Sequence, residues 1–367
     1  MGGTPFVYAA ALGLNITLRV GLSFFALPHS ALLAEFTGDY AERAVLGTYR
    51  ALFIVVGTAA ALVPSLGYVF AGPTAMLSAS AYRNLGFLTA ALIALFGSAC
   101  LFGIYPRARS LPLPVDQAAG QGSNLIGDVV GLFRNRSFVL MFVGAVLVLV
   151  GQGATAALNL HAFRYFWKLP AALMQLPLLM LPAGMLLGTA AAAIFLKRVE
   201  KRDGVLGAVS VLAVYQIGIT MAVWTGIVPA GSMLSVALVA GNGFLLGAGG
   251  AVCFVCFYSM IADAVDEHDL LFGIRREALF AAALMIGSKA ATGVGGFLAG
   301  LGLQFIGFDA SAGDSQVSDT LAGELGLLWG VVPAVILFVA LPLFRIYGIS
   351  RERHAEIAHS LSMRGSL

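Results

Sequence analysis

The chain has 367 residues, of which 59% are apolar and only 11% are charged, and its mean hydropathy is +0.92. Soluble domains carry roughly a quarter charged residues, so this composition excludes a water-soluble globular fold. The formal net charge of +3 is small, and the positions of the basic residues are more informative than their sum.

Long apolar stretches follow one another along the chain, separated by short polar or basic segments. Each has about 20 to 30 residues, enough for a helix to cross the ~30 Å hydrocarbon core of a bilayer. The stretches lack the alternation of a barrel wall, so the predicted fold class is an all-α membrane protein. We predict about nine transmembrane helices, over residues 5–35, 44–71, 82–104, 137–166, 170–197, 205–228, 232–262, 275–306 and 322–348.

The first predicted helix carries Arg19 inside the membrane, beside Asn15 and Thr17. A structural arginine that reaches the interface and a functional one fit this position equally well. The same helix ends in a short segment of alternating charges, from Glu35 to Arg43, which we interpret as part of a salt-bridged gate.

The longest polar interruption covers residues 106–136 and is rich in Pro, Gly, Gln and Arg, as expected of a linker. It separates a partial N-terminal bundle of three helices at 1–105 from a C-terminal bundle of six helices at 137–348, which a tail at 349–367 follows. Three further helices upstream would complete the six-plus-six plan of major facilitator transporters.

Basic residues gather on one side when the predicted helices cross the membrane in alternation. Of the 21 Lys and Arg residues, sixteen fall there, namely Arg43, Arg50, Arg107, Arg109, Arg134, Arg136, Lys197, Arg198, Lys201, Arg202, Arg275, Arg276, Arg345, Arg351, Arg353 and Arg364. The positive-inside rule makes this side, with the C-terminus, cytoplasmic in a bacterial-type inner (plasma) membrane. The N-terminus would then lie outside without a basic flank or a signal-peptide pattern, and we expect that preceding helices are missing.

Lys289 lies near the middle of the predicted helix 275–306. A cation at that depth costs about 2.5 to 3.5 kcal/mol even on the lenient insertion scale, so it should face a wet cavity. Contact with substrate or coupling ion is one interpretation, and a purely structural pairing is the other.

Three aspartates, Asp263, Asp266 and Asp269, recur at three-residue spacing beyond the seventh predicted helix. On a continuing helix they share one face, where their mutual repulsion calls for cationic partners. The sequence offers Arg275, Arg276 and Arg43. These residues form either a cytoplasmic gate or an ordinary solvated helix end, at which exposed pairs contribute only ~0–1 kcal/mol.

No catalytic or metal-binding constellation is present in the sequence, so we predict neither an enzyme nor a cofactor, apart from H⁺ or Na⁺ as a coupling ion. The scattered histidines are His29, His161, His268, His354 and His359. The cysteines all lie inside apolar stretches, which indicates packing rather than disulfides, and they are Cys100, Cys253 and Cys256. The predicted partners are a small-molecule solute and the lipid bilayer, with no nucleic acid and an open oligomeric state.

Two segments resemble the glycoside-pentoside-hexuronide:cation symporters, the melibiose-permease branch of the major facilitator superfamily. One runs from Leu27-Pro28 to Tyr40 and continues to Tyr49-Arg50. The other joins Met260-Ile261-Ala262-Asp263-Ala264-Val265-Asp266, Gly273-Ile274-Arg275-Arg276-Glu277 and Lys289. The resemblance implies that the nine helices correspond to the family's helices four to twelve, and that the first three are absent.

The resemblance also implies roles for single residues. Lys289 falls in the sugar and cation region, and Arg50 near the cytoplasmic side of the cavity. The inner gate would include Asp263, Asp266, Arg43 and Arg275. The chain departs from the family pattern at Ala26, where melibiose permease has a cation-site aspartate, and at Ser30, where it has an aromatic residue.

These patterns predict a secondary transporter that moves a sugar, glycoside or related small polar solute by alternating access, with cation-coupled symport as an option. One alternative is a carrier of a non-sugar, amphipathic lipid-like solute. The other is a truncated, partner-dependent membrane protein that does not transport.

Overall fold

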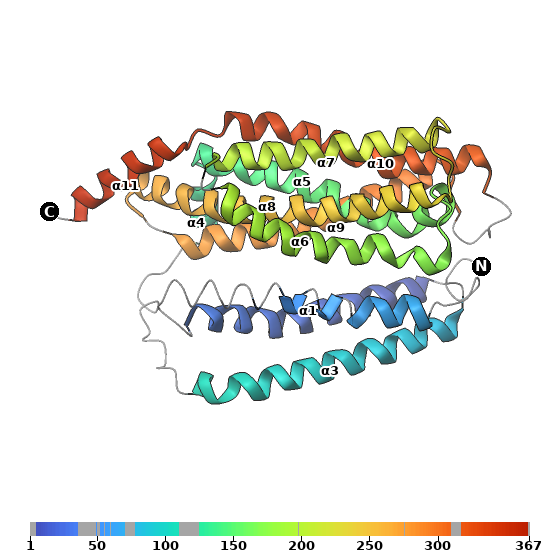
Figure 1. Ribbon diagram of the computed structural model, residues 1–367. Helices are drawn as coiled ribbons and strands as arrows, with labels where there is room; N and C mark the ends of the chain where they lie inside the picture. The colour runs from blue at the N-terminus through green and yellow to red at the C-terminus, as the bar shows by residue number, and fades with distance from the viewer. Residues whose placement is uncertain are drawn as a thin grey trace. The chain divides into compact units, whose positions relative to one another are not determined.

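The computed structural model describes residues 5–35, 49, 52–54, 56–58, 60–69, 78–109, 125–196, 198–274, 276–309 and 317–365. Every regular element within these residues is a helix, which agrees with the predicted all-α class (Figure 1). The chain forms two compact units. Unit 1 consists of Met1–Val56 and Asn84–Gly120, and unit 2 of Gly57–Arg83 and Gln121–Leu367.

Unit 1 contains α1 (Pro5–Glu35) and most of α3 (Ala79–Arg109). The two helices approach each other where the Cys100 thiol lies 3.8 Å from Nδ1 of His29. Within α1, Nε of Arg19 donates to the Asn15 side chain one turn earlier at 2.9 Å. This bond gives the arginine a partner on its own helix, which favours the structural interpretation of Arg19.

Further along, helical residues run over Leu52–Pro64 and a π-helical turn, η1, over Ser65–Val69. Unit 2 then contains six long helices and several short ones. They are α4 (Leu125–Leu132), α5 (Arg136–His161), η3 (Ala162–Phe166), η4 (Ala171–Leu173), α6 (Gln175–Phe195), α7 (Lys201–Trp224), α8 (Met233–Phe272), α9 (Glu277–Phe305), α10 (Asp319–Ile346) and α11 (Arg351–Gly365).

Side-chain caps fix where three of the long helices begin. Asn135, Ser232 and Ser318 each accept a hydrogen bond from the backbone N–H three residues later, at the starts of α5, α8 and α10. Such caps satisfy amide donors that the first helical turn leaves unpaired. Gly273 ends α8 in the left-handed conformation, at φ 71°, which glycine adopts without a steric penalty.

Within unit 2, α6 packs on α8 and α5 packs on α9, while α10 contacts α5 and α7. The α6–α8 contact is close because Gly243 and Gly247 face the backbone carbonyls of Pro177 and Leu181, where a Cβ would collide. Small residues allow this approach between membrane helices. Gly296 and Gly300 on α9 have the same spacing, but a Cβ on either would meet nothing within 4 Å.

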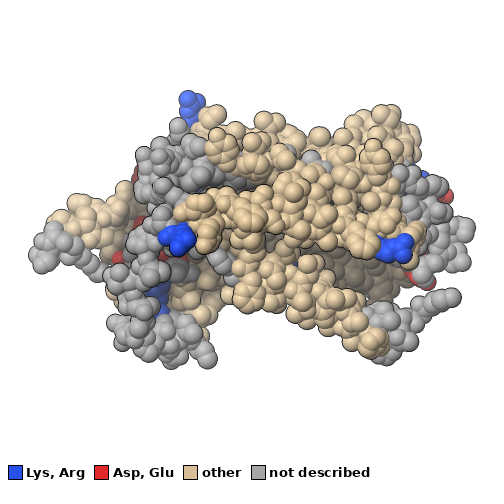
Figure 2. All heavy atoms as spheres, turned by 90° about the horizontal axis from the view of Figure 1, so that it is seen from below, with Lys and Arg blue, Asp and Glu red and all other residues tan. Residues whose placement is uncertain are grey.

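Seven helices of the described residues are long and apolar enough to cross a membrane: Ala79–Pro106, Arg136–Phe166, Gln175–Phe195, Lys201–Trp224, Met233–Phe272, Leu279–Phe305 and Asp319–Ile346. Two shorter apolar helices, Ala9–Phe25 and Leu52–Pro64, fall in the first two predicted spans. On the face drawn in Figure 2, the charged side chains lie near the helix ends, and the surface between them is almost free of charge. Such a surface suits the hydrocarbon core of a bilayer.

Helix α8 continues to Phe272, ten residues beyond the predicted end of the membrane span 232–262. At 40 residues, α8 is roughly 60 Å long, about twice the hydrocarbon thickness. The charges from Asp263 onward were expected to end the membrane span, and they do not end the helix. Helix α4 likewise lies in the predicted linker and α11 in the predicted tail.

Candidate functional site: a charged cluster at the α11 end

One end of unit 2 gathers the start of α7, the last turns of α8 and helix α11, and we call it the α11 end. Here the Lys201 ammonium lies 2.8 and 2.6 Å from the two carboxylate oxygens of Asp263. The Asp263 side chain is only 5% exposed and that of Lys201 27%. An ammonium on both oxygens of a buried carboxylate compensates the charge that burial would otherwise penalise.

Helix α11 brings a third group, because Nε2 of His354 lies 3.1 Å from Asp266 and 3.4 Å from Asp263. The two aspartates are three residues apart on α8 and therefore share a face, as we expected for a continuing helix. We call Lys201, Asp263, Asp266 and His354 the charged cluster. It joins α7, α8 and α11 through ionic and hydrogen-bonding contacts.

Further contacts hold α11 in place. The Arg351 guanidinium donates to the carbonyl oxygens of Leu196 and Val199 at the end of α6, the latter at 2.9 Å. Cations are favourable at the carbonyl end of a helix. One turn beyond His354, Ile357 is fully buried. Arg351, His354 and Ile357 therefore hold one face of α11 against the bundle.

Tyr347, between α10 and α11, supports the same region. Its hydroxyl donates to the carbonyl of Met260 on α8 at 3.3 Å. Burial, together with the carboxylates of Asp263 and Glu267, raises the pKa of this phenol. The hydroxyl therefore remains a proton donor over the physiological pH range.

The remaining predicted site residues lie apart from this cluster. Lys289 is exposed on α9, on the face that also carries Gly293, Gly296 and Gly300. Asp269 is half-buried in the last turn of α8, and Arg276 is half-buried immediately before α9. Arg43, Arg50 and Arg275 lie outside the described residues, so their predicted roles stay predictions.

The aspartates of the cluster contact two residues that the sequence did not single out, Lys201 and His354. Lys201 is 62 residues from Asp263, and His354 is 88 residues from Asp266. No local spacing connects groups so distant. The only available signal was that both were predicted on the same side of the membrane as the aspartates.

A second polar group lies inside the bundle. The Gln216 amide on α7 donates to Thr155 of α5 at 3.2 Å and to the Trp329 carbonyl of α10 at 2.9 Å. The Trp329 indole in turn donates to Asn159 at 2.8 Å. Gln216 and Thr155 are 2% exposed, so this network is sealed from solvent. It connects α5, α7 and α10 through hydrogen bonds.

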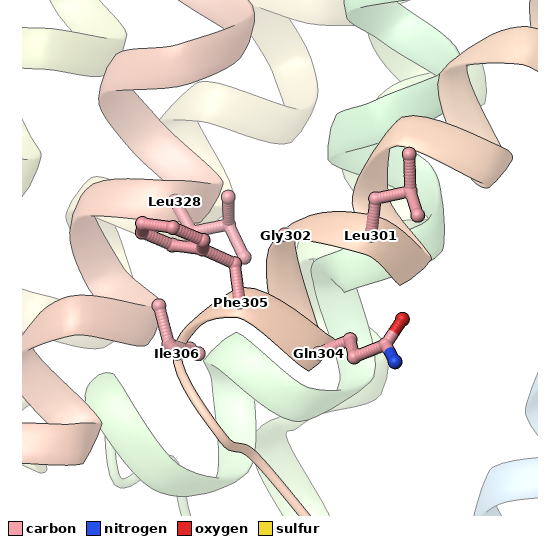
Figure 3. A pocket seen from close by; sticks show the side chains of 6 residues that line it. All are labelled: Leu301, Gly302, Gln304, Phe305, Ile306 and Leu328. Atoms are coloured by element: carbon pink, nitrogen blue, oxygen red, sulfur yellow. The ribbon is translucent and has the colours of Figure 1, made fainter.

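An apolar hollow of about 480 Å³ lies at the opposite end of α9 and α10 (Figure 3). Its walls are Leu301, Gly302, Gln304, Phe305, Ile306 and Leu328. Phe305 is 93% exposed. With a single amide and no charged side chain, the hollow suits hydrocarbon better than a sugar. Among the described residues, no group of three His, Cys, Asp or Glu side chains could hold a metal ion.

The chain is similar to two curated proteins over short segments. An uncharacterized symporter of Synechocystis sp. is 32% identical over 121 residues, which are 32% of this chain and 22% of that protein. The uncharacterized symporter YjmB of Bacillus subtilis is 29% identical over 108 residues, 29% of this chain and 23% of that protein. The matched segments thus span less than a quarter of either relative.

The model of one family covers almost the whole chain, from residue 2 to residue 351, and its description is MFS/sugar transport protein. That description agrees with the multi-pass helical fold, the charge-poor surface and the predicted resemblance to major facilitator carriers rather than to enzymes. The chain therefore belongs to the MFS/sugar transport protein family.

Proposed function

We propose that this chain acts as a secondary transporter of a sugar, glycoside or related small polar solute, by alternating access and coupled to a cation gradient. Family membership supports carriage of a solute, and the word symporter in the names of both relatives supports coupling. The charge bias of the sequence supports a plasma-membrane location with the α11 end in the cytoplasm.

Lys289 carries this proposal, because it is a cation within a membrane-spanning helix. Its side chain is exposed, and the glycines one, two and three turns further along α9 leave the same face open. A lysine that faces lipid would be strongly unfavourable. A face in contact with water and solute would explain both the charge of Lys289 and the glycines beside it. On this proposal Lys289 contacts solute or the coupling site.

The charged cluster has a different role in the proposal. It lies at a helix end, away from mid-membrane, and so it suits opening and closing better than solute recognition. In the proposed cycle, Asp263 and Asp266 belong to the cytoplasmic gate, Asp263 as its fixed part because Lys201 holds both of its oxygens. Asp269, Arg276 and the undescribed Arg43 and Arg275 are further members. Arg50 is assigned to the cavity near that gate.

The test is uptake by the purified chain in proteoliposomes, with radiolabelled glycosides, pentosides and hexuronates under an inward H⁺ or Na⁺ gradient. We expect gradient-driven accumulation of at least one solute, and a loss of more than about tenfold in Lys289→Ala at unchanged protein content. Lys168→Ala is the matched control, because Lys168 is an exposed lysine bonded to Asp319 outside the membrane core. It should transport normally.

Two results would contradict the proposal. If the folded wild-type chain accumulates none of these solutes, it does not transport them on its own, and the partner-dependent alternative is favoured. If it flips a fluorescent lysolipid and ignores the sugars, its solute is amphipathic and lipid-like.

A further inference from the structure

The two aspartates of the charged cluster occupy different environments, although they lie one turn apart on α8. Asp263 is 5% exposed and holds the Lys201 ammonium through both oxygens. Asp266 is 22% exposed, and its carboxylate lies 3.1 Å from the His354 ring. One carboxylate is therefore sealed inside the bundle, and the other lies at its edge.

The sealed pair is a permanent contact between α7 and α8. Separating Lys201 from Asp263 would leave a buried carboxylate with the His354 ring, 3.4 Å away, in place of an ammonium bonded to both of its oxygens. Asp263 is for this reason poorly suited to exchange partners during a transport cycle. Asp266, which is open to water, can release one partner and accept another.

His354 connects the cluster to α11, because its ring lies within 3.4 Å of both aspartates. A protonated imidazole forms an ion pair with these carboxylates, and a neutral one that carries its proton on Nε2 donates a hydrogen bond to one of them. In both forms the ring ties α11 to Asp266.

The contacts of α11 on the bundle lie along one face of the helix. Along its 15 residues they include the Arg351 guanidinium on the carbonyls that end α6, the His354 ring, and the buried Ile357. Most other described side chains of the helix are exposed. A helix attached through one short face can leave it at modest cost, whereas the long helices of the bundle cannot.

We propose that α11 is a releasable clamp, in which His354 occupies Asp266 from within unit 2 and competes with any other cation for that carboxylate. Asp263 anchors α8 permanently, while Asp266 changes partner, and α11 leaves the bundle when it does. The link to gating rests on the proposed transport function. The docking of α11 through His354 does not.

Docking is tested by hydrogen–deuterium exchange of the α11 amides, in the purified full chain in lipid nanodiscs without solute. His354→Ala and Asp266→Asn should each speed exchange of residues 351–363 by roughly tenfold, because each removes a charge-assisted hydrogen bond. Arg353→Ala is the matched control on the same helix. Arg353 pairs with Glu356 at 2.8 Å on the exposed face, so its loss should leave exchange nearly unchanged.

A charge swap separates a broken contact from a damaged fold. The double variant His354→Asp with Asp266→His should regain most of the protection that each single variant loses. Wild-type exchange in His354→Ala, or equal acceleration in Arg353→Ala, would overturn the clamp. This experiment measures no transport, so its outcome is independent of the proposed function.

Release is tested separately, in proteoliposomes in which the wild type accumulates solute. Cysteines introduced as His354→Cys and Asp266→Cys are joined by a bismaleimide that a reductant cleaves, and the wild-type chain receives the same treatment. We expect uptake to stop on joining and to return on cleavage to the level of the unjoined variant. Undiminished uptake by the joined protein would show that α11 stays docked during transport.

Discussion

Two glycine pairs with the same spacing serve opposite purposes in unit 2. On α8, Gly243 and Gly247 lie against the backbone of α6, with no room for a Cβ. On α9, Gly296 and Gly300 have nothing within 4 Å, and they share their face with Lys289. A GxxxG spacing therefore identifies a helix face without side chains, and the neighbours of that face decide whether helix packing or an open surface results.

The largest expected effect is that of filling the packed face. Gly247→Val places two methyl groups into the carbonyl of Leu181 and should destabilise the α6–α8 contact by about 3 kcal/mol or more. We expect loss of monodisperse protein in gel filtration and of membrane abundance. Normal yield and thermal stability of Gly247→Val would show that α6 and α8 can move apart to accept a side chain. The packed face of α8 would then tolerate substitution as the open face of α9 is expected to do.

The buried ion pair ranks next. Asp263→Ala strands Lys201 in a half-buried position and should destabilise the protein by about 3 kcal/mol, whereas Asp266→Ala, at the exposed edge, should cost about 1 kcal/mol. Thermal unfolding in nanodiscs measures both. The double variant Asp263→Ala with Lys201→Met should recover part of the loss, because it removes the stranded charge. Equal effects of the two aspartates would contradict the division between anchor and exchangeable carboxylate.

The buried amide of Gln216 should have a smaller effect. Gln216→Leu removes bonds to Thr155 and to the Trp329 carbonyl, and hydrogen bonds between membrane helices contribute about 0.6 to 1.7 kcal/mol. A fall in Tm of about 2 to 4 °C is expected for a unit of this size. Gln175→Leu is a control, since its amide donates to the carbonyl of Ala172, three residues earlier in the chain. A larger fall in Tm for Gln216→Leu than for Asp263→Ala would contradict the expected ranking of the two variants.

Much of this fold could be predicted from the sequence, because each membrane helix corresponds to one continuous apolar stretch. The helices α5 to α10 begin and end within a few residues of the predictions, apart from the last turns of α8. This difference between helix and predicted span has a physical cause. Hydropathy reports where a helix leaves the hydrocarbon, whereas helix length depends on capping, and α8 ends only at Gly273.

The candidate site was less predictable, because its contacts join distant segments. The sequence correctly suggested that Asp263 and Asp266 share a face and need cations, but charge type and spacing could not select Lys201 or His354 from the many bases on that side. The high energy of a cation inside the membrane, by contrast, singled out Lys289 from its own position in the sequence alone. The energetic cost of a charge in the membrane follows from the position of that residue along the chain. Its ion-pair partner depends instead on how distant segments pack.

The smallest expected effect on folding, and the sharpest test of the comparison, comes from filling the open face. Gly296→Leu adds a side chain where nothing lies within 4 Å, so thermal stability should stay within about 0.5 kcal/mol of wild type. If the face around Lys289 is kept clear for solute, the same variant should lose uptake in proteoliposomes. Gly218→Leu on α7, also without neighbours within 4 Å, is the matched control and should transport normally. Stable protein with intact uptake in both variants would mean that the glycines of α9 keep no path open, and Lys289 would then need another explanation for its place in the membrane.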